Sequence, residues 1–228
     1  MTTSDGMYIG RTRFAAGDRT GPDSTRTVLR NPAIDTAVLE IAPDGILNDG
    51  LGVDRCDVAV VMNVSTDPLN SEKAHAVEDC SRVMTVITRA VSPDGASVLN
   101  ADDEGTARLV ETAHGEIFYF SRDEQNPVIG DHLLKGGKAV VLRQTLAGEM
   151  VTLLAGEGET ALLLATELSS THDGFMQVNI ASVLAATAAA IAQNVPLETI
   201  RTSLRSSFVT CDVLGTRAGN RADDETGE

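Results

Sequence analysis

The stretch VAVVMN, residues 58–63, decides the fold class. Its apolar residues run without a break up to the polar Asn63, which is typical of a parallel strand buried on both faces. The stretch TAVLE, residues 36–40, has the same form and ends in Glu40. We expect two buried parallel strands that carry functional side chains at their carboxyl ends, because open α/β sheets bind ligands there.

Residues 76–91 follow the period of a helix. Their apolar positions, three or four residues apart, are Val77, Cys80, Val83, Met84, Ile87 and Val91. The spacing predicts an amphipathic helix, and we expect Ser92-Pro93-Asp94-Gly95 to end it. Residues 97–99 and 117–120 should form strands, with a helical stretch over residues 105–112 between them. This alternation indicates an α/β fold with a parallel central sheet flanked by helices.

The pattern changes beyond Gly136. Residues 139–143, 149–154 and 160–165 are strand-like and are separated by turns that contain glycine. They predict a small antiparallel sheet near residues 139–165, because short turns join antiparallel strands.

Two helices are expected near the end of the chain. Residues 179–193 are rich in alanine, and residues 197–205 follow Pro196, which suits a helix start. Residues 217–228 are polar and acidic, which indicates a flexible tail. We therefore expect one domain over residues 1–216 followed by this tail.

Composition excludes several classes of partner. The 228 residues carry a formal net charge of −15, so the surface should repel nucleic acids and anionic membranes. No apolar run approaches the roughly 20 residues that span a bilayer. Cys56, Cys80 and Cys211 are odd in number and widely spaced, which indicates neither disulfides nor a zinc site. We expect a cytoplasmic protein.

Several short pieces, taken in order along the chain, carry a resemblance to a known family. They are Thr2 to Ile9, Gly17-Asp18 with Thr20-Gly21-Pro22, Ala37 to Glu40, Gly45-Ile46-Leu47, Gly50-Leu51-Gly52, Cys56-Asp57-Val58 with Asn63, Val98 to Asp103, Lys135-Gly136-Gly137, Phe175-Met176 with Asn179, and Asn194-Val195-Pro196. Together they resemble the cyanophycin synthetases, in the part related to the Mur ligases. The resemblance implies a Mur-ligase-type central sheet.

The resemblance also implies a reaction. Domains of this family bind ATP and Mg²⁺, activate a carboxylate as an acyl phosphate and let the amine of an amino acid attack it. In the cyanophycin synthetases, the Mur-like half adds arginine to a polyaspartate chain. Such chemistry needs a cradle for the triphosphate, a metal ion and positioned charges.

Glu40 matches the metal-associated glutamate of the family, which makes it the expected catalytic residue and Mg²⁺ ligand. A carboxylate at a strand end is a suitable ligand for a hard cation. The alternative is a carboxylate that only accepts hydrogen bonds from nearby backbone amides.

The resemblance implies a nucleotide site as well. Its expected residues are Asn63, Asn100, Asp102, Asp103 and Asn179. Amides can pair with the edge of a base, and aspartates can accept from ribose hydroxyls. The alternative is turn chemistry, since Asn and Asp often bond their own backbone.

The sequence departs from the family at charged positions. The family places a glycine-rich loop ending in Lys and Thr before the point where this sequence begins, and the 228 residues contain no G-x-x-x-x-G-K-[ST] spacing. Asp67-Pro68 stands where the family has Asp-His, Met84 where it has lysine, and Pro43-Asp44-Gly45 where it has Arg-Gly-Gly. The resemblance also fades beyond Phe208. We expect a domain truncated at both ends.

These departures predict a degenerate, non-catalytic relative of the ligases that binds a partner. The partner is expected to be a second copy or a complementary protein chain that covers uncovered strand edges. One alternative is an arginine-adding ligase subunit whose phosphate loop comes from another chain. Another is a weak nucleotide or amino-acid binding module that uses Asn100, Asp103 and Asn179.

Overall fold

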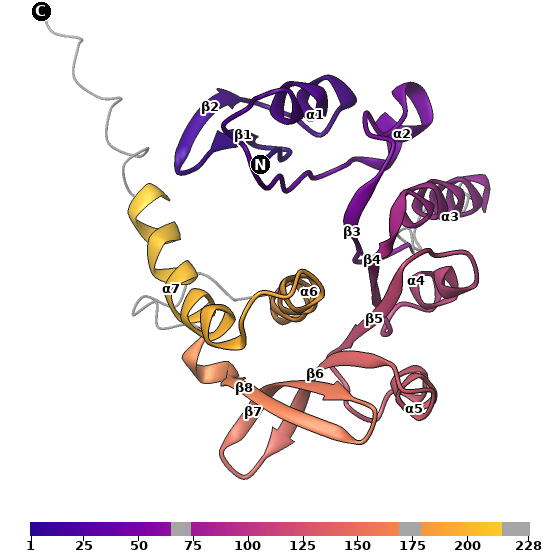
Figure 1. Cartoon of the computed structure of the whole chain (residues 1–228), viewed down its shortest axis with the longest axis vertical. Coiled ribbons are helices and arrows are strands. Elements are labelled where there is room, and N and C mark those ends of the chain that lie inside the picture. Colours follow the sequence, from indigo (N-terminus) through magenta and orange to yellow (C-terminus); the bar gives the residue numbers. More distant parts are fainter. Residues whose placement is uncertain (65–73, 169–178, 216–228) are drawn as a thin grey trace, which may run out of the picture. The chain divides into compact units, whose positions relative to one another are not determined.

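The computed structural model describes residues 1–64, 74–168 and 179–215 (Figure 1). The chain forms two compact units, Met1–Ser97 with Asp103–Glu116, and Val98–Asp102 with the residues from Ile117 onward. The predicted tail over residues 217–228, Asp67-Pro68 and Phe175-Met176 lie outside the described residues.

The helices and strands follow one another along the chain. In order they are β1 (Gly6–Ile9), β2 (Thr12–Ala16), α1 (Pro22–Leu29), α2 (Pro43–Asp49), β3 (Cys56–Val61), α3 (Ala74–Arg89), β4 (Val91–Asn100), α4 (Glu104–Ala107), η2 (Arg108–Glu111), β5 (Glu116–Ser121), α5 (Pro127–Leu134), β6 (Lys138–Thr145), β7 (Gly148–Ala155), β8 (Gly158–Leu164), η3 (Ala165–Glu167), α6 (Ile180–Ala192) and α7 (Leu197–Gly215). None of the described helices combines the length and apolar composition that crossing a bilayer requires.

A six-stranded sheet in the order β3-β4-β5-β6-β7-β8 confirms the α/β fold class. β5 pairs with β6 in parallel, while β6 with β7 and β7 with β8 are antiparallel. The predicted antiparallel strands near residues 139–165 therefore continue the main sheet. Thr145 pairs with Gly148 and Ala155 with Gly158, so two-residue turns join these strands, as their spacing predicted.

The predicted strand over residues 36–40 is wrong. Leu39 forms only an isolated parallel bridge with Thr2, through bonds from the Thr2 amide to the Val38 carbonyl and from the Glu40 amide to the Thr2 carbonyl, both 3.0 Å. Val38 is 64% exposed. A buried strand needs neighbours on both sides, and among the described residues this segment is paired on one side only.

The turn predicted at residues 92–95 is also wrong, because β4 begins at Val91 and runs through it. Pro93 and Asp94 occupy an exposed part of the strand, where the missing amide of a proline is tolerated. Gly95 comes so close to β3 that an added Cβ would lie 2.3 Å from the Asp57 carbonyl oxygen. Gly95 therefore allows β4 to approach β3 closely, and it does not form a turn.

The first unit also contains the antiparallel hairpin of β1 and β2, which the sequence did not predict. Its register shifts at Met7 and Tyr8, and Phe14 in β2 is 69% exposed. The helix predicted over residues 76–91 is confirmed as α3, with Val83 buried.

The second unit has its core around β6. Ala139, Val140 and Val141 are completely buried, and α5 and α6 both contact β6, one on either side of it in Figure 1. The prediction missed α5, although Asn126 accepts from the Val128 amide at 2.9 Å and Pro127 follows it, which is a recognisable start signal. The predicted helices over residues 179–193 and 197–205 are confirmed as α6 and α7, the latter extending to Gly215.

Candidate functional site

Asp103, one of the predicted site residues, is buried and accepts three hydrogen bonds from the chain. It lies in the first unit, it is 9% exposed, and it is the N-cap of α4. Its Oδ2 accepts from the Thr106 amide at 2.8 Å, from the Thr106 hydroxyl at 2.7 Å and from the Val64 amide at 3.0 Å. This carboxylate therefore caps a helix and fixes the chain that follows β3 and Asn63.

Asp102 lies in the second unit and joins two loops there. Its carboxylate accepts from the Ser121 hydroxyl, from the Arg122 amide at 2.8 Å and from the Asn126 side-chain amide at 3.2 Å. Asn126 also donates to the Ala101 carbonyl at 3.0 Å while its oxygen caps α5. These bonds connect the end of β4 to the loop after β5.

Asn100 and Asn179 have local roles. The side-chain oxygen of Asn100, which is 6% exposed, accepts from the Asp102 amide at 3.0 Å, as in an Asx-turn. Asn179 is exposed and caps α6 by accepting from the Ser182 amide at 3.3 Å. Both contacts are the turn and cap chemistry that was the alternative to nucleotide binding.

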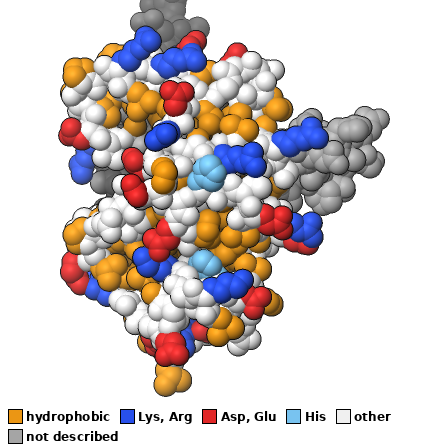
Figure 2. Space-filling view, turned by 45° about the vertical axis from the view of Figure 1, so that its right-hand side comes forward, with side chains coloured by type: hydrophobic (Ala, Val, Ile, Leu, Met, Phe, Trp, Pro, Cys, Tyr) orange, Lys and Arg blue, Asp and Glu red, His pale blue; other side chains and the backbone are white. Residues whose placement is uncertain are grey.

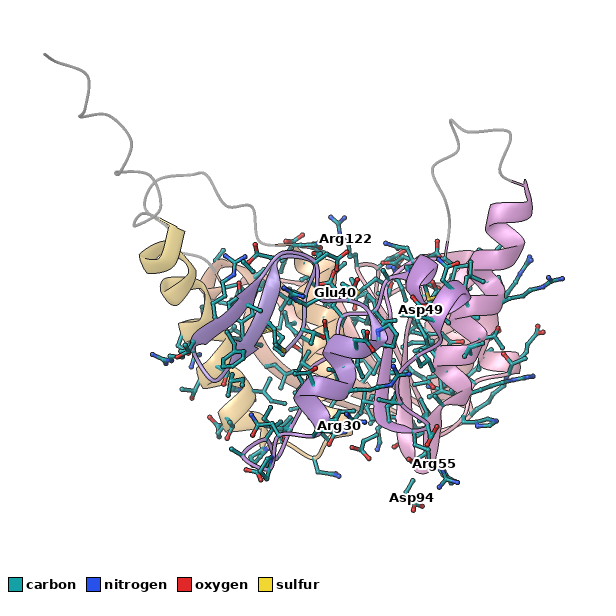
Figure 3. The ribbon with its side chains drawn as sticks, turned by 90° about the horizontal axis from the view of Figure 1, so that it is seen from above. Arg30, Glu40, Asp49, Arg55, Asp94 and Arg122 are labelled. Carbon is teal, nitrogen blue, oxygen red and sulfur yellow. The ribbon has the colours of Figure 1, made fainter. Side chains whose placement is uncertain are left out.

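Glu40 is exposed in the segment between α1 and α2 (Figure 3). Its carboxylate accepts from the Ser4 amide at 3.1 Å. Among the labelled cations of the first unit, Arg30 and Arg55 lie well away from it in this view. Glu40 therefore stays accessible to a ligand, although it sits beside a single bridge and not at the tip of a buried strand.

Asn63 is exposed two residues beyond the end of β3, as predicted from the polar end of that run. Its neighbour Val64 is 2% exposed and is bonded to Asp103. Within the first unit, the Asp103 carboxylate therefore bonds the residue that follows Asn63. The Glu40 carboxylate instead bonds the Ser4 amide.

An open hollow of about 600 Å³ lies between α1 and α2 in the first unit. It is lined by Asp18, Thr20, Gly21, Pro22, Asp23, Ser24, Arg26, Ala42, Gly45 and Asp49. Hydrogen bonds from the Thr20 amide, at 2.9 Å, and the Thr20 hydroxyl, at 2.7 Å, lower the pKa of Asp18. The sequence offered Gly17-Asp18 with Thr20-Gly21-Pro22 only as part of the family resemblance, and no site was predicted there.

Cys56 lies partly buried at the start of β3. Burial, with a smaller effect from the neighbouring Asp57, raises the pKa of its thiol. A raised pKa keeps the thiol protonated at neutral pH, whereas a reactive cysteine needs thiolate.

Among the residues that the structure describes, no three His, Cys, Asp or Glu side chains are grouped closely enough to hold a metal ion. Both carboxylate oxygens of Asp102 and the Oδ2 of Asp103 already accept bonds from the chain, so a cation at these atoms would have to compete with those donors. In the described structure, Asp102 and Asp103 each accept several hydrogen bonds, whereas the Glu40 carboxylate accepts one, from the exposed Ser4 amide.

On the face in Figure 2, acidic and basic side chains are interspersed, with apolar side chains scattered among them.

Comparison with known proteins gives three findings. The Mur ligase middle domain model matches residues 1–190. A cyanophycin synthetase from Geminocystis herdmanii is 38% identical over 205 residues, which are 90% of this chain and 23% of that protein. One from Crocosphaera subtropica is 37% identical over 205 residues, with the same coverage of 90% and 23%.

Solved structures are more distant. A crystal structure of MurF from Acinetobacter baumannii aligns with a TM-score of 0.41 and 22% identity, over 65% of this chain and 28% of that one. The chain spans about a quarter of the length of the curated relatives it matches.

Proposed function

We propose, from the premise that this chain belongs to the Mur ligase middle-domain family, that its 228 residues form a ligase-derived domain that performs no ligation alone and acts by binding a partner polypeptide. The relatives are named cyanophycin synthetases, which are ATP-dependent ligases. The partner is a second copy of the chain or a complementary protein chain. We place the protein in the cytoplasm, a proposal supported by its odd number of cysteines.

The observation that carries the proposal is the hydrogen bonding of Asp102 and Asp103, the two aspartates that match the family. Asp103 accepts three hydrogen bonds through one oxygen, and Asp102 accepts three through its two oxygens. Binding a metal or a ribose would take these acceptors away from donors of the chain, at a cost of about 1–3 kcal/mol for each buried donor left unpaired. Their geometry supports a structural role.

Phosphate chemistry gives further support. A nucleotide's terminal phosphates need several amide donors and a lysine to neutralise them. The three lysines, Lys73, Lys135 and Lys138, do not stand in a G-x-x-x-x-G-K-[ST] pattern. Lys138 instead lies over the Phe118 ring, 5.2 Å from its centroid.

Partner binding is supported by strand edges in the first unit. β3 is the terminal strand of its sheet, and Val60 in it is 41% exposed. Val38, beside the Thr2–Leu39 bridge, is 64% exposed. Apolar strand edges that carry neither lysine nor proline bind extended segments of other polypeptides.

Two measurements on the purified chain test the proposal. Calorimetry with ATP and Mg²⁺ should give heats equal to buffer dilution, and light scattering should give a mass above the 24.0 kDa of one chain that rises with concentration. A chain that remains a monomer at every concentration and retains no other polypeptide in a pull-down counts against the proposal. A chain that by itself hydrolyses ATP while joining an amino acid to a carboxylate contradicts the proposal.

One observation favours the alternative of a ligase subunit completed by another chain. The exposed Glu40 carboxylate, bonded only to the Ser4 amide in the described residues, is open to a metal ion. This alternative predicts nucleotide affinity and arginine-dependent ADP release only after a phosphate-loop fragment is added. Heats with ATP in the isolated chain would instead favour a weak nucleotide-binding module.

A further inference from the structure

The outer edge of β8 is bonded by a side chain. β8 is the terminal strand at its end of the described sheet. Arg201 in α7 donates from Nε to the Leu162 carbonyl at 3.0 Å and from Nη2 to the Ala161 carbonyl at 2.7 Å. Because a guanidinium holds its donors in a rigid fork, the two bonds fix it along the strand edge.

A β-bulge places these two carbonyls within reach of one group. Thr152 of β7 pairs with Ala161, and Val151 pairs with Leu163, so Leu162 is the additional residue. In a regular strand, successive carbonyls point to opposite edges. At a bulge the regular ladder is interrupted, and here both carbonyls reach Arg201.

The Arg201 side chain is itself held in place by its neighbours. Its side chain is 23% exposed, its Nη1 is paired with Glu198, and the neighbouring Ile200 is 4% exposed. One turn further along α7, Arg205 donates to Glu167 from Nη2 at 2.9 Å and from Nε at 3.2 Å. Side chains of α7 thus form hydrogen bonds with both β8 and η3.

The strand under this contact is suited to pairing. β8 has the sequence GETALLL, which contains neither lysine nor proline. Without the guanidinium, the carbonyls of a mostly apolar edge would be available to another strand. The outer edge of β8 is therefore a pairing surface that the chain closes itself.

We propose that Arg201 blocks the β8 edge from pairing, antiparallel, with the β8 edge of a second copy of this chain. Pairing centred on Ala161 would set Glu159 opposite Leu163 of the other copy, so the charges of the strand do not oppose it. The net charge of −15 opposes it at long range, and salt screens that repulsion. The β8 edge is distinct from the β3 edge, which is where the proposed partner would bind.

The test uses the full chain carrying Val60→Lys, which is expected to weaken association through β3. In that background, Arg201→Met deletes the donors while keeping a long side chain. Sedimentation velocity at about 0.1 M and about 1 M salt should show dimers in this variant, with association at least about tenfold stronger than in the Val60→Lys parent and stronger at high salt. Hydrogen exchange should show salt-dependent protection of the β8 amides.

Two controls make the test specific. Ala161→Lys, at an exposed edge position, should return the Arg201→Met variant to the mass of its Val60→Lys parent, because a lysine on an edge strand blocks pairing. Arg205→Met removes the ion pair with Glu167 but leaves the edge bonded, so it should keep the mass of the parent.

A folded Arg201→Met variant that keeps the mass of its parent, with unchanged β8 exchange, overturns the proposal. If Arg201→Met does not fold, Arg201→Leu decides the question by the same two readouts, since it also removes the charge and every donor and suits a helix. None of these outcomes depends on nucleotide binding, and each variant is compared with the same Val60→Lys parent, so failure here leaves the proposed function standing.

Discussion

Asp103 holds Val64 in place across 39 residues of sequence: its Oδ2 accepts from the Val64 amide at 3.0 Å. Val64 is 2% exposed, so few alternative partners are available for that amide. The same oxygen begins α4 through Thr106. Asp103, which the family resemblance assigned to a nucleotide site, therefore connects the chain after β3 to the start of α4 in the first unit.

Replacing Asp103 with alanine should destabilise the protein without changing nucleotide heats. The variant loses an N-cap and leaves the buried Val64 amide unpaired, which together cost about 2–4 kcal/mol. Urea unfolding followed by circular dichroism measures the loss. Asp94→Ala is the matched control, because Asp94 is exposed on β4 and should change stability by less than about 0.5 kcal/mol. Normal stability with altered ATP heats would assign Asp103 to binding.

Gly95→Ala should lower thermal stability, because its Cβ would lie 2.3 Å from the Asp57 carbonyl oxygen and 3.0 Å from Val91. Overpacking of this kind costs about 1–3 kcal/mol. Gly45→Ala serves as its control, since a Cβ there meets nothing within 4 Å and Gly45 lies within α2. The control should be neutral or stabilising by up to about 1 kcal/mol. Equal melting temperatures for both variants would show that β3 and β4 are not so close.

Val60→Lys should weaken association of the chain, because a lysine on the β3 edge must be desolvated when another strand pairs there. Light scattering across a concentration series is the measurement, and the apparent dissociation constant should rise at least about tenfold. Val86→Lys places the same charge on α3, where Val86 is 47% exposed. If the two variants associate equally, the β3 edge is not the contact.

The stability of the second unit should depend on pH through Glu167. A hydrogen bond from the Leu164 amide, at 3.0 Å, and then the contact with Arg205 lower the pKa of this carboxyl below its ordinary 4.5. A depressed acid contributes stability that is fully present above its ordinary pKa and is lost as pH falls through the lower folded value.

Urea unfolding of Glu167→Gln between about pH 7 and pH 2 checks this sign. The difference in unfolding free energy between the wild type and the variant should be constant above about pH 4.5 and should shrink below it. Glu157→Gln, at an exposed position in the β7–β8 turn, is the comparison variant, because it removes one carboxylate and leaves the contacts of Glu167 with Leu164 and Arg205 in place. A gap that widens on acidification would contradict the assignment.

Local pattern determined much of this protein. The apolar run before Asn63 gave β3, the helical spacing of Val83 and Ile87 gave α3, and the glycine turns after residue 136 gave three antiparallel strands. These features are encoded by neighbouring residues, because side-chain periods and turn conformations are local properties. The ordered family pieces also placed the chain among the Mur ligase relatives.

Tertiary structure alone decided which groups of the chain these polar residues bond. Only the folded chain brings Asp103 to the Val64 amide and Asp102 to Asn126, because these partners are far apart in sequence. The segment ending in Glu40 carried a strand pattern, yet it forms one bridge, because a strand is defined by its neighbours. The Arg201 contact with β8 joins residues about 40 positions apart, which no local period encodes.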